Sequence, residues 1–289
     1  MSFKERLNSG KFLVTSEIGP PKGISLSKIL EEMTPVKEKI DAVNVTDLQS
    51  SILRMSALAA SIILKQHGFE PIFQVTCRDR NRLALQSDIL SAAAFGIENI
   101  LALTGDHPSL GDHPEAKPVF DLDAISLIEI MRKFERGYDM NDNKLLGSTP
   151  KFCVGAAVNP GADPLEPEII KMEKKLAAGA EFFQTQAVFD VRILENFLKA
   201  TKHLKTKILA GIVLLKSERM AKYLNEHVPG ISVPSDIADE MAQASDKRQS
   251  CVQISARLIR QIKPLCQGVH LMPIGWYSVV PSVLDAIGS

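Results

Sequence analysis

Short apolar runs alternate with longer segments of helical periodicity along the whole of this 289-residue chain. Such alternation is typical of βα units, in which each strand of a parallel sheet is followed by a helix that covers it. Several of the runs are nearly continuous in apolar residues, as expected for strands buried on both faces. Eight runs are predicted to be strands: residues 12–18, 42–46, 72–77, 100–104, 152–158, 182–188, 208–214 and 269–274.

The segments between these runs carry apolar residues at every third or fourth position, which predicts helices. Gly96 and Gly179 stand where a left-handed residue would end two of these helices. Two stretches interrupt the pattern: residues 133–150, a predicted long loop, and residues 216–246, predicted to contain several short helices. The predicted main helices are residues 26–40, 51–66, 80–95, 123–134, 167–178, 191–203 and 250–262.

Eight strands with intervening helices favour a single closed (β/α)8 barrel, because closure leaves no strand edge exposed. Such a barrel uses about 250 residues, so we expect one catalytic domain over residues 1–289. An open, doubly wound sheet is the alternative architecture.

The charge balance restricts the partners of the chain. Lys plus Arg and Asp plus Glu number 34 each, so the formal net charge is zero. Nucleic acids and anionic membranes attract positively charged surfaces, so neither is an expected partner. No run approaches the roughly 18 apolar residues of a membrane span, and the first residues lack the apolar core of a secretory signal. Four widely spaced cysteines are expected to be reduced thiols of a cytoplasmic protein.

Polar residues follow nearly every predicted strand, at the end where an α/β barrel carries its active site. Glu17 follows the first strand, and burial at the barrel mouth would favour the protonated form that a proton donor needs. A carboxylate that caps a loop or pairs with a lysine is an equally weighted reading. The strand-end set is Glu17, Thr46, Asp47, Gln74, Thr76, Thr104, Asp106, Asn159, Gln184, Gln186 and Lys216.

The stretch TGDHPSLGDHP after the fourth predicted strand is the most distinctive part of the sequence. Gly105 lets the backbone approach a ligand closely, because it has no side chain. His107 and His113 lie near Asp106 and Asp112, which is the composition of a metal site. Prolines interrupt this loop and no further ligand is evident, so we predict that no metal is bound.

Common nucleotide and hydrolase motifs are missing from the sequence. There is no GxGxxG, no GxxxxGK[ST] and no GxSxG, which disfavours a Rossmann dinucleotide site, a P-loop and a serine nucleophile. Lys174 and Lys175 follow Glu173 in a predicted helix. Their default interpretation is a solvated helix face, with a phosphate contact as the minor alternative.

Taken together, these residues resemble the methylenetetrahydrofolate reductase family, the flavin-dependent (β/α)8 barrels that reduce 5,10-methylenetetrahydrofolate to 5-methyltetrahydrofolate. The resemblance covers essentially the whole chain in length and strand order. It is most specific in the segments SEIGPPKG, VNVTD, FQVTC, ILALTGDHP, KMEKKLAAGAEFFQTQAVFD and LAGIVLL. It implies a flavoprotein oxidoreductase of one-carbon metabolism and methionine biosynthesis.

The resemblance also implies roles for individual residues. Glu17 resembles the acid that assists opening of the folate imidazolidine ring, and Asp106 the aspartate that lies near the flavin pyrimidine edge and faces the folate. Gln186 resembles a glutamine that contacts the pterin, and Gln184 is a second expected folate contact. The expected cofactor-binding residues are Thr46, Gln74, Thr104, Gly105, Asp106, Ala157, Asn159, Glu168 and Lys175.

Departures from the family pattern leave the far half of the cofactor and the electron donor open. Thr104 stands where many members have Arg, Gln74 where many have His, and the loop around Asn159 is shorter. The implied cofactor is FAD, with FMN as the alternative, and the implied substrates are methylenetetrahydrofolate and NADH or NADPH. A flavin-independent folate reductase is a further alternative.

A second function, of a different class, is a folate- or flavin-binding subunit that acts inside a complex. A partner protein, such as an electron-transfer or corrinoid-pathway subunit, would then supply the electrons in place of NAD(P)H. Homo-oligomers are common in the family, so a homo-oligomer is expected.

Overall fold

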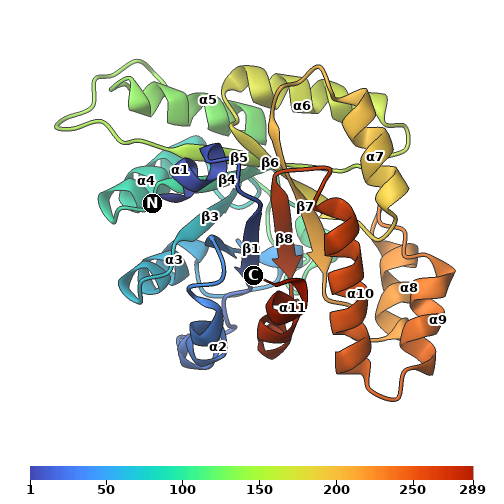
Figure 1. Ribbon diagram of the computed structural model, residues 1–289. Helices are drawn as coiled ribbons and strands as arrows, with labels where there is room; N and C mark the ends of the chain where they lie inside the picture. Colours follow the sequence, from blue (N-terminus) through green and yellow to red (C-terminus); the bar gives the residue numbers. More distant parts are fainter. Residues whose placement is uncertain (289) are drawn as a thin grey trace.

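The computed structural model describes residues 1–288 and shows eight parallel strands closed into a barrel, with helices outside it (Figure 1). Each strand pairs with its neighbours in sequence, and β1 closes the ring by pairing with β8. The predicted (β/α)8 barrel is therefore confirmed, and the open sheet is wrong. Ser289, the last residue of the predicted domain, lies outside the described residues. The strands are β1 (Leu13–Ile18), β2 (Ala42–Val45), β3 (Pro71–Thr76), β4 (Asn99–Leu103), β5 (Cys153–Val158), β6 (Phe182–Ala187), β7 (Lys207–Val213) and β8 (Gly268–Met272).

Polar side chains and glycines fix several helix ends where the sequence predicts them. The Asn81 side chain accepts hydrogen bonds from two backbone amides of α4, and Gly179 ends α6 in the left-handed conformation. The segment 216–246 contains α8 and α9, as predicted. The helices are α1 (Phe3–Asn8), α2 (Ser27–Met33), α3 (Ala57–Gln66), α4 (Arg82–Ala94), α5 (Ala124–Glu135), α6 (Glu166–Ala178), α7 (Val191–Ala200), α8 (Glu218–His227), α9 (Ser235–Gln243), α10 (Lys247–Ile262) and α11 (Val280–Ile287).

Two predicted helices have wrong bounds for identifiable reasons. The helix expected over residues 26–40 ends at Met33 and continues as a 3-10 turn, Thr34–Val36, that contains a proline. The helix expected over residues 51–66 begins only at Ala57. Ser50 and Ser51 have φ angles of 54° and 57°, which no α-helix accommodates. The loop after β2 is therefore longer than the sequence suggests.

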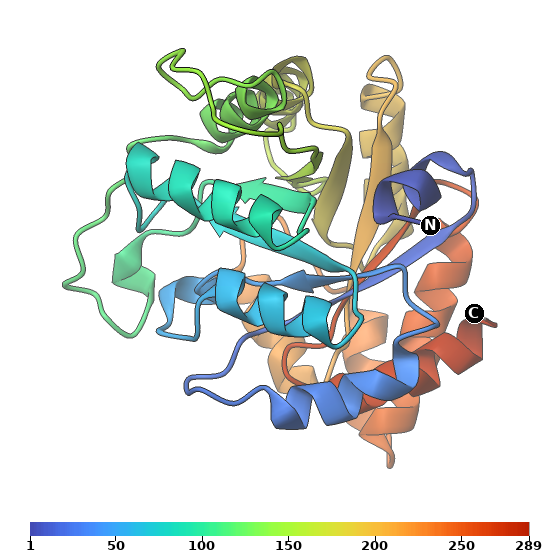
Figure 2. The same cartoon turned by 90° about the vertical axis from the view of Figure 1, so that its left-hand side faces the viewer.

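The short helix α1 lies across the end of the barrel at which the strands begin (Figure 2). Its Phe3 ring packs edge-on against Phe182 of β6, with 5.4 Å between ring centroids. Phe3 and Leu7 are both buried and contact the layer of interior side chains nearest the amino-terminal end of the barrel. The amino-terminal end of the barrel is thus closed by apolar packing.

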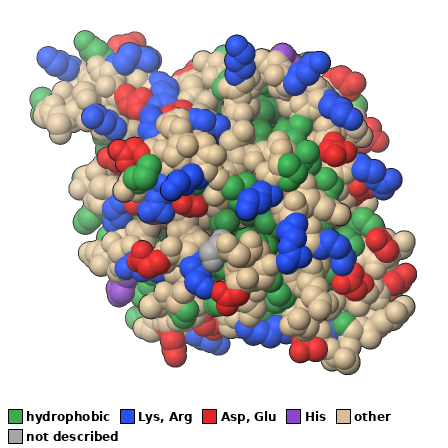
Figure 3. Space-filling model, in the orientation of Figure 1, with side chains coloured by type: hydrophobic (Ala, Val, Ile, Leu, Met, Phe, Trp, Pro, Cys, Tyr) green, Lys and Arg blue, Asp and Glu red, His purple; other side chains and the backbone are tan. Residues whose placement is uncertain are grey.

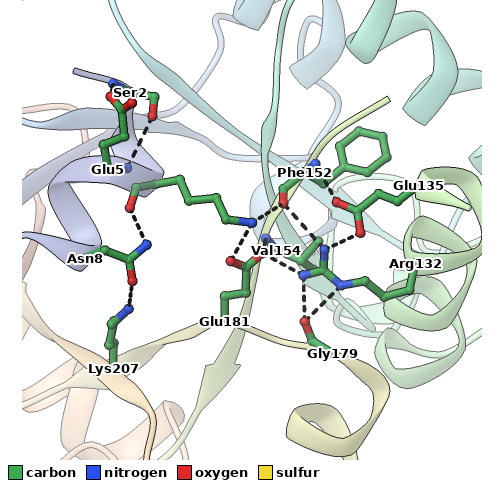
Figure 4. A network of polar contacts seen from close by, with 11 residues as sticks. Ser2, Glu5, Asn8, Arg132, Glu135, Phe152, Val154, Gly179, Glu181 and Lys207 are labelled. Carbon is green, nitrogen blue, oxygen red and sulfur yellow. Dashed lines mark hydrogen bonds and ion pairs between the residues drawn. The ribbon is translucent and has the colours of Figure 1, made fainter. Parts of the chain in front are cut away.

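Polar contacts hold α1 in this position (Figure 4). The Lys4 ammonium donates to the Phe152 carbonyl at 3.2 Å and lies 2.8 Å from the Glu181 carboxylate. Arg132 of α5 pairs with the same Glu181 and with Glu135, each at 2.7 Å. Because Glu181 is shared, the network joins α1 to α5 and to the start of β6.

The remaining composition-based expectations concern thiols and surface charge. All four cysteines are free, and burial raises the pKa of the Cys77 and Cys153 thiols to about 12. No helix within residues 1–288 is long and apolar enough to cross a membrane. On the face drawn in Figure 3, basic and acidic side chains are interspersed, in keeping with the zero net charge of the sequence.

The closure of the barrel by α1 predicts a large stability loss on truncation of Phe3. Phe3→Ala should lower the free energy of unfolding by about 3–5 kcal/mol, because it removes a buried aromatic side chain and leaves a cavity. Denaturant unfolding measures the change. Leu146→Ala is the control, since Leu146 is 97% exposed, and a Phe3→Ala loss no larger than that of the control would contradict the closing role of α1.

Candidate active site at the carboxyl end of the barrel

A cavity of about 330 Å³ opens at the carboxyl ends of the strands, a volume typical of small-molecule sites. Its walls come from the ends of β3 to β6, from the loops after β2 and β4, and from α6. Eleven of the predicted site residues line it: Gln74, Thr104, Gly105, Asp106, Ala157, Asn159, Glu168, Lys175, Gln186 and, from the wider strand-end set, Asp47 and Thr76. The fold thus gathers residues more than 110 positions apart in the sequence around one cavity.

Thr46 is the predicted cofactor residue that does not line this cavity. It follows β2 directly and is buried. Its hydroxyl has no hydrogen-bond partner among the described residues. An unpaired buried hydroxyl costs free energy, so this group has unused capacity to bind a ligand.

Arg78, which the sequence analysis does not single out, fixes the loop that carries Asp106. Its guanidinium is almost completely buried and is paired with Asp79 at 2.7 Å. It donates to the carbonyl oxygens of Asp106 at 3.3 Å and of Leu48 at 3.1 Å. One cation therefore joins the loops after β2, β3 and β4.

Gly105 packs directly over Arg78. Its φ angle is +93°, and an added Cβ atom would lie 3.1 Å from the Arg78 Cβ and 3.2 Å from the Thr76 Cβ. Because of both the positive φ angle and these contacts, a larger residue at position 105 would cost stability. The close approach shown is to β3 and the loop after it, and an approach of Gly105 to a ligand stays a prediction.

Asp47 forms the wall between β2 and β3. Its carboxylate accepts hydrogen bonds from the Thr76 amide at 2.8 Å and the Thr76 hydroxyl at 2.9 Å, and it also pairs with Arg80. Arg80 pairs in addition with Asp88 of α4 at 2.7 Å. Asp47 and Thr76 thus help to form the cavity wall. They already bond to other groups of the protein.

Lys175 brings a positive charge to the opposite wall. Its ammonium donates to the Ala157 carbonyl at 2.7 Å, and burial lowers its pKa, with Glu168 acting against that shift. Glu168 in turn accepts from the Asn159 amide at 3.1 Å. The default interpretation of Lys175 as part of a solvated face is therefore wrong, because α6 lies across the end of β5 and turns this residue inward, whereas Lys174 is exposed.

Glu17 lines a second, smaller hollow of about 120 Å³ beside the ends of β1 and β8. Gln49 borders both this hollow and the main cavity. Tyr277 holds the turn after Glu17, because its hydroxyl accepts from the Gly19 amide at 2.9 Å. Burial raises the pKa of the Tyr277 phenol, so it stays a neutral hydrogen-bonding group.

Inside the barrel, beneath Glu17, lies a set of buried polar side chains. His270 of β8 lies 3.4 Å from the Glu17 carboxylate and 3.0 Å from the Thr15 hydroxyl. Gln184 and Asn44 exchange two amide hydrogen bonds of 2.7 and 3.0 Å. The sequence analysis names Gln184 but not His270, Thr15 or Asn44.

The two predicted glutamines of β6 lie in different surroundings. Gln186 is exposed and lines the main cavity. Gln184 is buried deeper in the barrel, and its amide is already paired with Asn44. The strand register between β6 and β7 shifts between Gln184 and Ala187. Gln186 is therefore the accessible one of the two.

The histidines after β4 make only local side-chain contacts among the described residues. The His107 ring bonds the Ser109 hydroxyl, and the His113 ring bonds Asp112. Lys22 pairs with Asp112 at 2.6 Å, and this contact lowers the pKa of that carboxyl. Across residues 1–288 no group of three or more His, Cys, Asp and Glu is placed to hold a metal ion. The absence of a bound metal stays a prediction.

Comparisons with known proteins place the chain among one set of relatives. The family model described as methylenetetrahydrofolate reductase matches residues 2–288. Methylenetetrahydrofolate reductase 2 of Schizosaccharomyces pombe is 24% identical over 92% of this chain and 43% of that protein. The 5,10-methylenetetrahydrofolate reductase of Pectobacterium carotovorum is 24% identical over 76% of this chain and 71% of that protein. The chain thus spans less than half of the fungal relative.

A solved structure with a similar fold is an uncharacterised protein from Clostridium thermocellum that binds two copies of 5-methyl-5,6,7,8-tetrahydrofolic acid. It superimposes with a TM-score of 0.63 over 100% of this chain and 98% of that chain, at 16% identity. A 2,3-dimethylmalate lyase superimposes with a TM-score of 0.51 at 10% identity. These likenesses support the barrel architecture.

The position of Gly105 predicts a specific effect on ligand binding at the cavity. Gly105→Ala should destabilise the chain by about 1–2 kcal/mol through its left-handed φ and should also weaken binding of added FAD or FMN at least tenfold. Flavin fluorescence titration and thermal unfolding measure the two effects.

Gly10→Ala is the matched control. Gly10 has a φ of +76° and open space around an added Cβ, and it follows α1 at the other end of the barrel. The control should lose stability but bind flavin normally. Equal flavin affinity in both variants would show that the Gly105 loop does not shape a flavin site.

Proposed function

The chain belongs to the methylenetetrahydrofolate reductase family, and from that membership we propose that it reduces 5,10-methylenetetrahydrofolate to 5-methyltetrahydrofolate with a bound flavin. One observation carries the proposal: Asp106, Gln186 and Lys175 line a single cavity at the carboxyl end of the barrel, with Glu17 in the adjoining hollow. The 5-methyltetrahydrofolic acid bound by the clostridial neighbour is the product of this reaction. Residues 1–289 would act as one catalytic domain.

The residues around the cavity fit a flavin by their chemistry. Gln74 and Thr104 line the cavity and offer hydrogen bonds to a polar ring edge. Lys175 uses one N–H on the Ala157 carbonyl, so two N–H groups remain for a phosphate. A bound phosphate would also offset the burial of that ammonium. We propose FAD, with FMN as the alternative, since both carry a phosphate on the ribityl chain.

A flavin bound here would supply the hydride that converts the methylene group of the folate to a methyl group. Asp106 would place a negative charge close to both the flavin and the folate. That charge would oppose further negative charge on the cofactor and would stabilise a cationic folate, so it would favour transfer of hydride from one to the other. Arg78 donates a hydrogen bond to the Asp106 backbone carbonyl, which restrains the loop that carries this carboxylate.

Glu17 would act as the acid that opens the folate imidazolidine ring. Its proton passes to the ring nitrogen that leaves the methylene carbon, and the carbon becomes the iminium that accepts hydride. Gln49 borders both the Glu17 hollow and the main cavity. A folate that reaches both Asp106 and Glu17 would pass this side chain, which lies on an exposed loop. Gln186 would then contact the pterin.

NADH or NADPH is the proposed electron donor, and it would alternate with folate at the open cavity. The second candidate is a folate- and flavin-binding subunit to which a partner protein delivers electrons. Four free thiols fit a cytoplasmic protein, and a homo-oligomer is the proposed assembly.

Anaerobic addition of NADH and of NADPH to the flavin-loaded protein separates the two candidate functions. Loss of the flavin absorption supports direct reduction by the nucleotide, and an unchanged spectrum supports the partner-fed subunit.

The acid role of Glu17 predicts a selective loss in one half of the reaction. Glu17→Gln should lower folate turnover at least tenfold, because the amide cannot deliver the proton. Reduction of the flavin by its donor should be unchanged, since that step needs no acid. Stopped-flow absorbance measures both half-reactions.

Glu31→Gln serves as the control, since Glu31 is an exposed carboxylate of α2. It should leave both half-reactions at the wild-type rate. Folate turnover in Glu17→Gln within threefold of wild type would rule out Glu17 as the acid.

A further inference from the structure

We propose that His270 is a positioning residue for Glu17 and that a buried chain of hydrogen bonds holds it in the neutral tautomer with its proton on Nε2. This series of hydrogen bonds runs from Asn44 through Gln184 and Thr15 to His270. The proposal rests on the proposed function only for the acid role of Glu17. The hydrogen-bond chain and the tautomer concern the protein without any ligand.

The strand register brings these side chains together. Thr15 of β1 pairs with His270 of β8. Thr15 and Glu17 are two residues apart, so both point to the same side of β1. The exposed fractions are 0% for Thr15, 5% for Glu17 and 3% for His270. All three therefore lie inside the barrel, screened from solvent.

The direction of the hydrogen bonds can be followed from the inner end. Asn44 Nδ2 donates to Gln184 Oε1 at 2.7 Å, and Gln184 Nε2 donates to Asn44 Oδ1 at 3.0 Å. These two bonds fix the orientation of both amides, because each nitrogen must face an oxygen. The second N–H of Gln184 then donates to Thr15 Oγ1 at 3.5 Å.

The Thr15 hydroxyl has one proton of its own to donate. Two acceptors lie within reach, His270 Nδ1 at 3.0 Å and the Val269 carbonyl at 3.4 Å. The shorter contact favours Nδ1 as the acceptor. A neutral imidazole with an accepting Nδ1 carries its proton on Nε2, and Nε2 lies 3.4 Å from Glu17 Oε2.

The contact between His270 and Glu17, at the other end of this series of hydrogen bonds, disfavours the other neutral tautomer. It would turn the bare lone pair of His270 Nε2 toward Glu17 Oε2. Once Glu17 has given up its proton it has only acceptor oxygens, so two acceptors would then face each other in a buried place, and the buried carboxylate would lack a donor. Both the Thr15 side and the Glu17 side therefore favour the proton on Nε2.

This arrangement suits an acid that must lose its proton in a buried site. The His270 N–H occupies Oε2 of Glu17, which leaves Oε1 to carry the proton toward the folate. As the proton departs, negative charge grows on the carboxylate, and the hydrogen bond from Nε2 becomes charge-assisted and stronger. Such bonds are often long before substrate binds, in keeping with the 3.4 Å separation. His270 touches neither folate nor flavin in this account.

The direct test is ¹⁵N NMR of histidine-labelled protein without ligand. The His270 resonances should show a protonated Nε2 and a bare Nδ1 in the wild type. Thr15→Val removes the hydroxyl at nearly constant volume and should give a mixture of tautomers. Thr201→Val is the matched control, because Thr201 is also buried and, within residues 1–288, its hydroxyl bonds only the Phe197 carbonyl of α7. A proton on Nδ1 in the wild type would overturn the proposal.

The kinetic test measures reoxidation of photoreduced, flavin-loaded protein by methylenetetrahydrofolate. Thr15→Val and His270→Asn should slow this step at least fivefold, with the KM for folate and the rate of flavin photoreduction unchanged. His270→Gln should stay within threefold of wild type, because its amide N–H lies near the position of Nε2–H.

Wild-type rates in Thr15→Val and His270→Asn would overturn the proposal, as would equal losses in His270→Gln and His270→Asn. A wild type that folate does not reoxidise would contradict the proposed function instead. The tautomer measured by NMR would then decide the proposal by itself.

Discussion

Closure of eight parallel strands into one barrel is the constraint on which the rest of the structure depends. Closure sends every strand in the same direction, so all carboxyl ends and the loops after them meet at one rim. Glu17 of β1, Asp106 after β4 and Gln186 of β6 are far apart in the sequence, yet each lies at this rim. The opposite end, filled by Phe3 and the apolar layer above it, is free to serve stability alone.

Polarity changes along the barrel axis in step with this division. The interior layer nearest the amino-terminal end contains residues such as Leu13, Ile72 and Phe182. The layers nearer the rim contain Thr15, Gln184 and His270. Burying polar groups is costly unless they are paired, and here they pair with one another. A layer of paired polar side chains therefore lies beneath Glu17, between the rim and the apolar end of the barrel.

The fold was predictable because periodicity alone encodes strands and helices, and every predicted strand lies within two residues of an observed one. The start of α3 was not, since the left-handed serines before it look like helix in the sequence. Strand-end residues of the main cavity followed from the barrel rule and the family resemblance. Arg78 was missed because it lies in a run of charged residues, and His270 because it lies inside an apolar strand. The contacts of both residues join segments that are distant in the sequence.

The central claim is that the rim cavity holds a flavin able to pass a hydride to folate. Its most direct test is anaerobic and independent of the electron donor: flavin-loaded protein is photoreduced, then mixed with 5,10-methylenetetrahydrofolate, while visible absorption and folate products are followed. The account predicts recovery of the oxidised flavin spectrum with one 5-methyltetrahydrofolate formed per flavin. A flavin that stays reduced, or a protein that takes up neither FAD nor FMN, would contradict it.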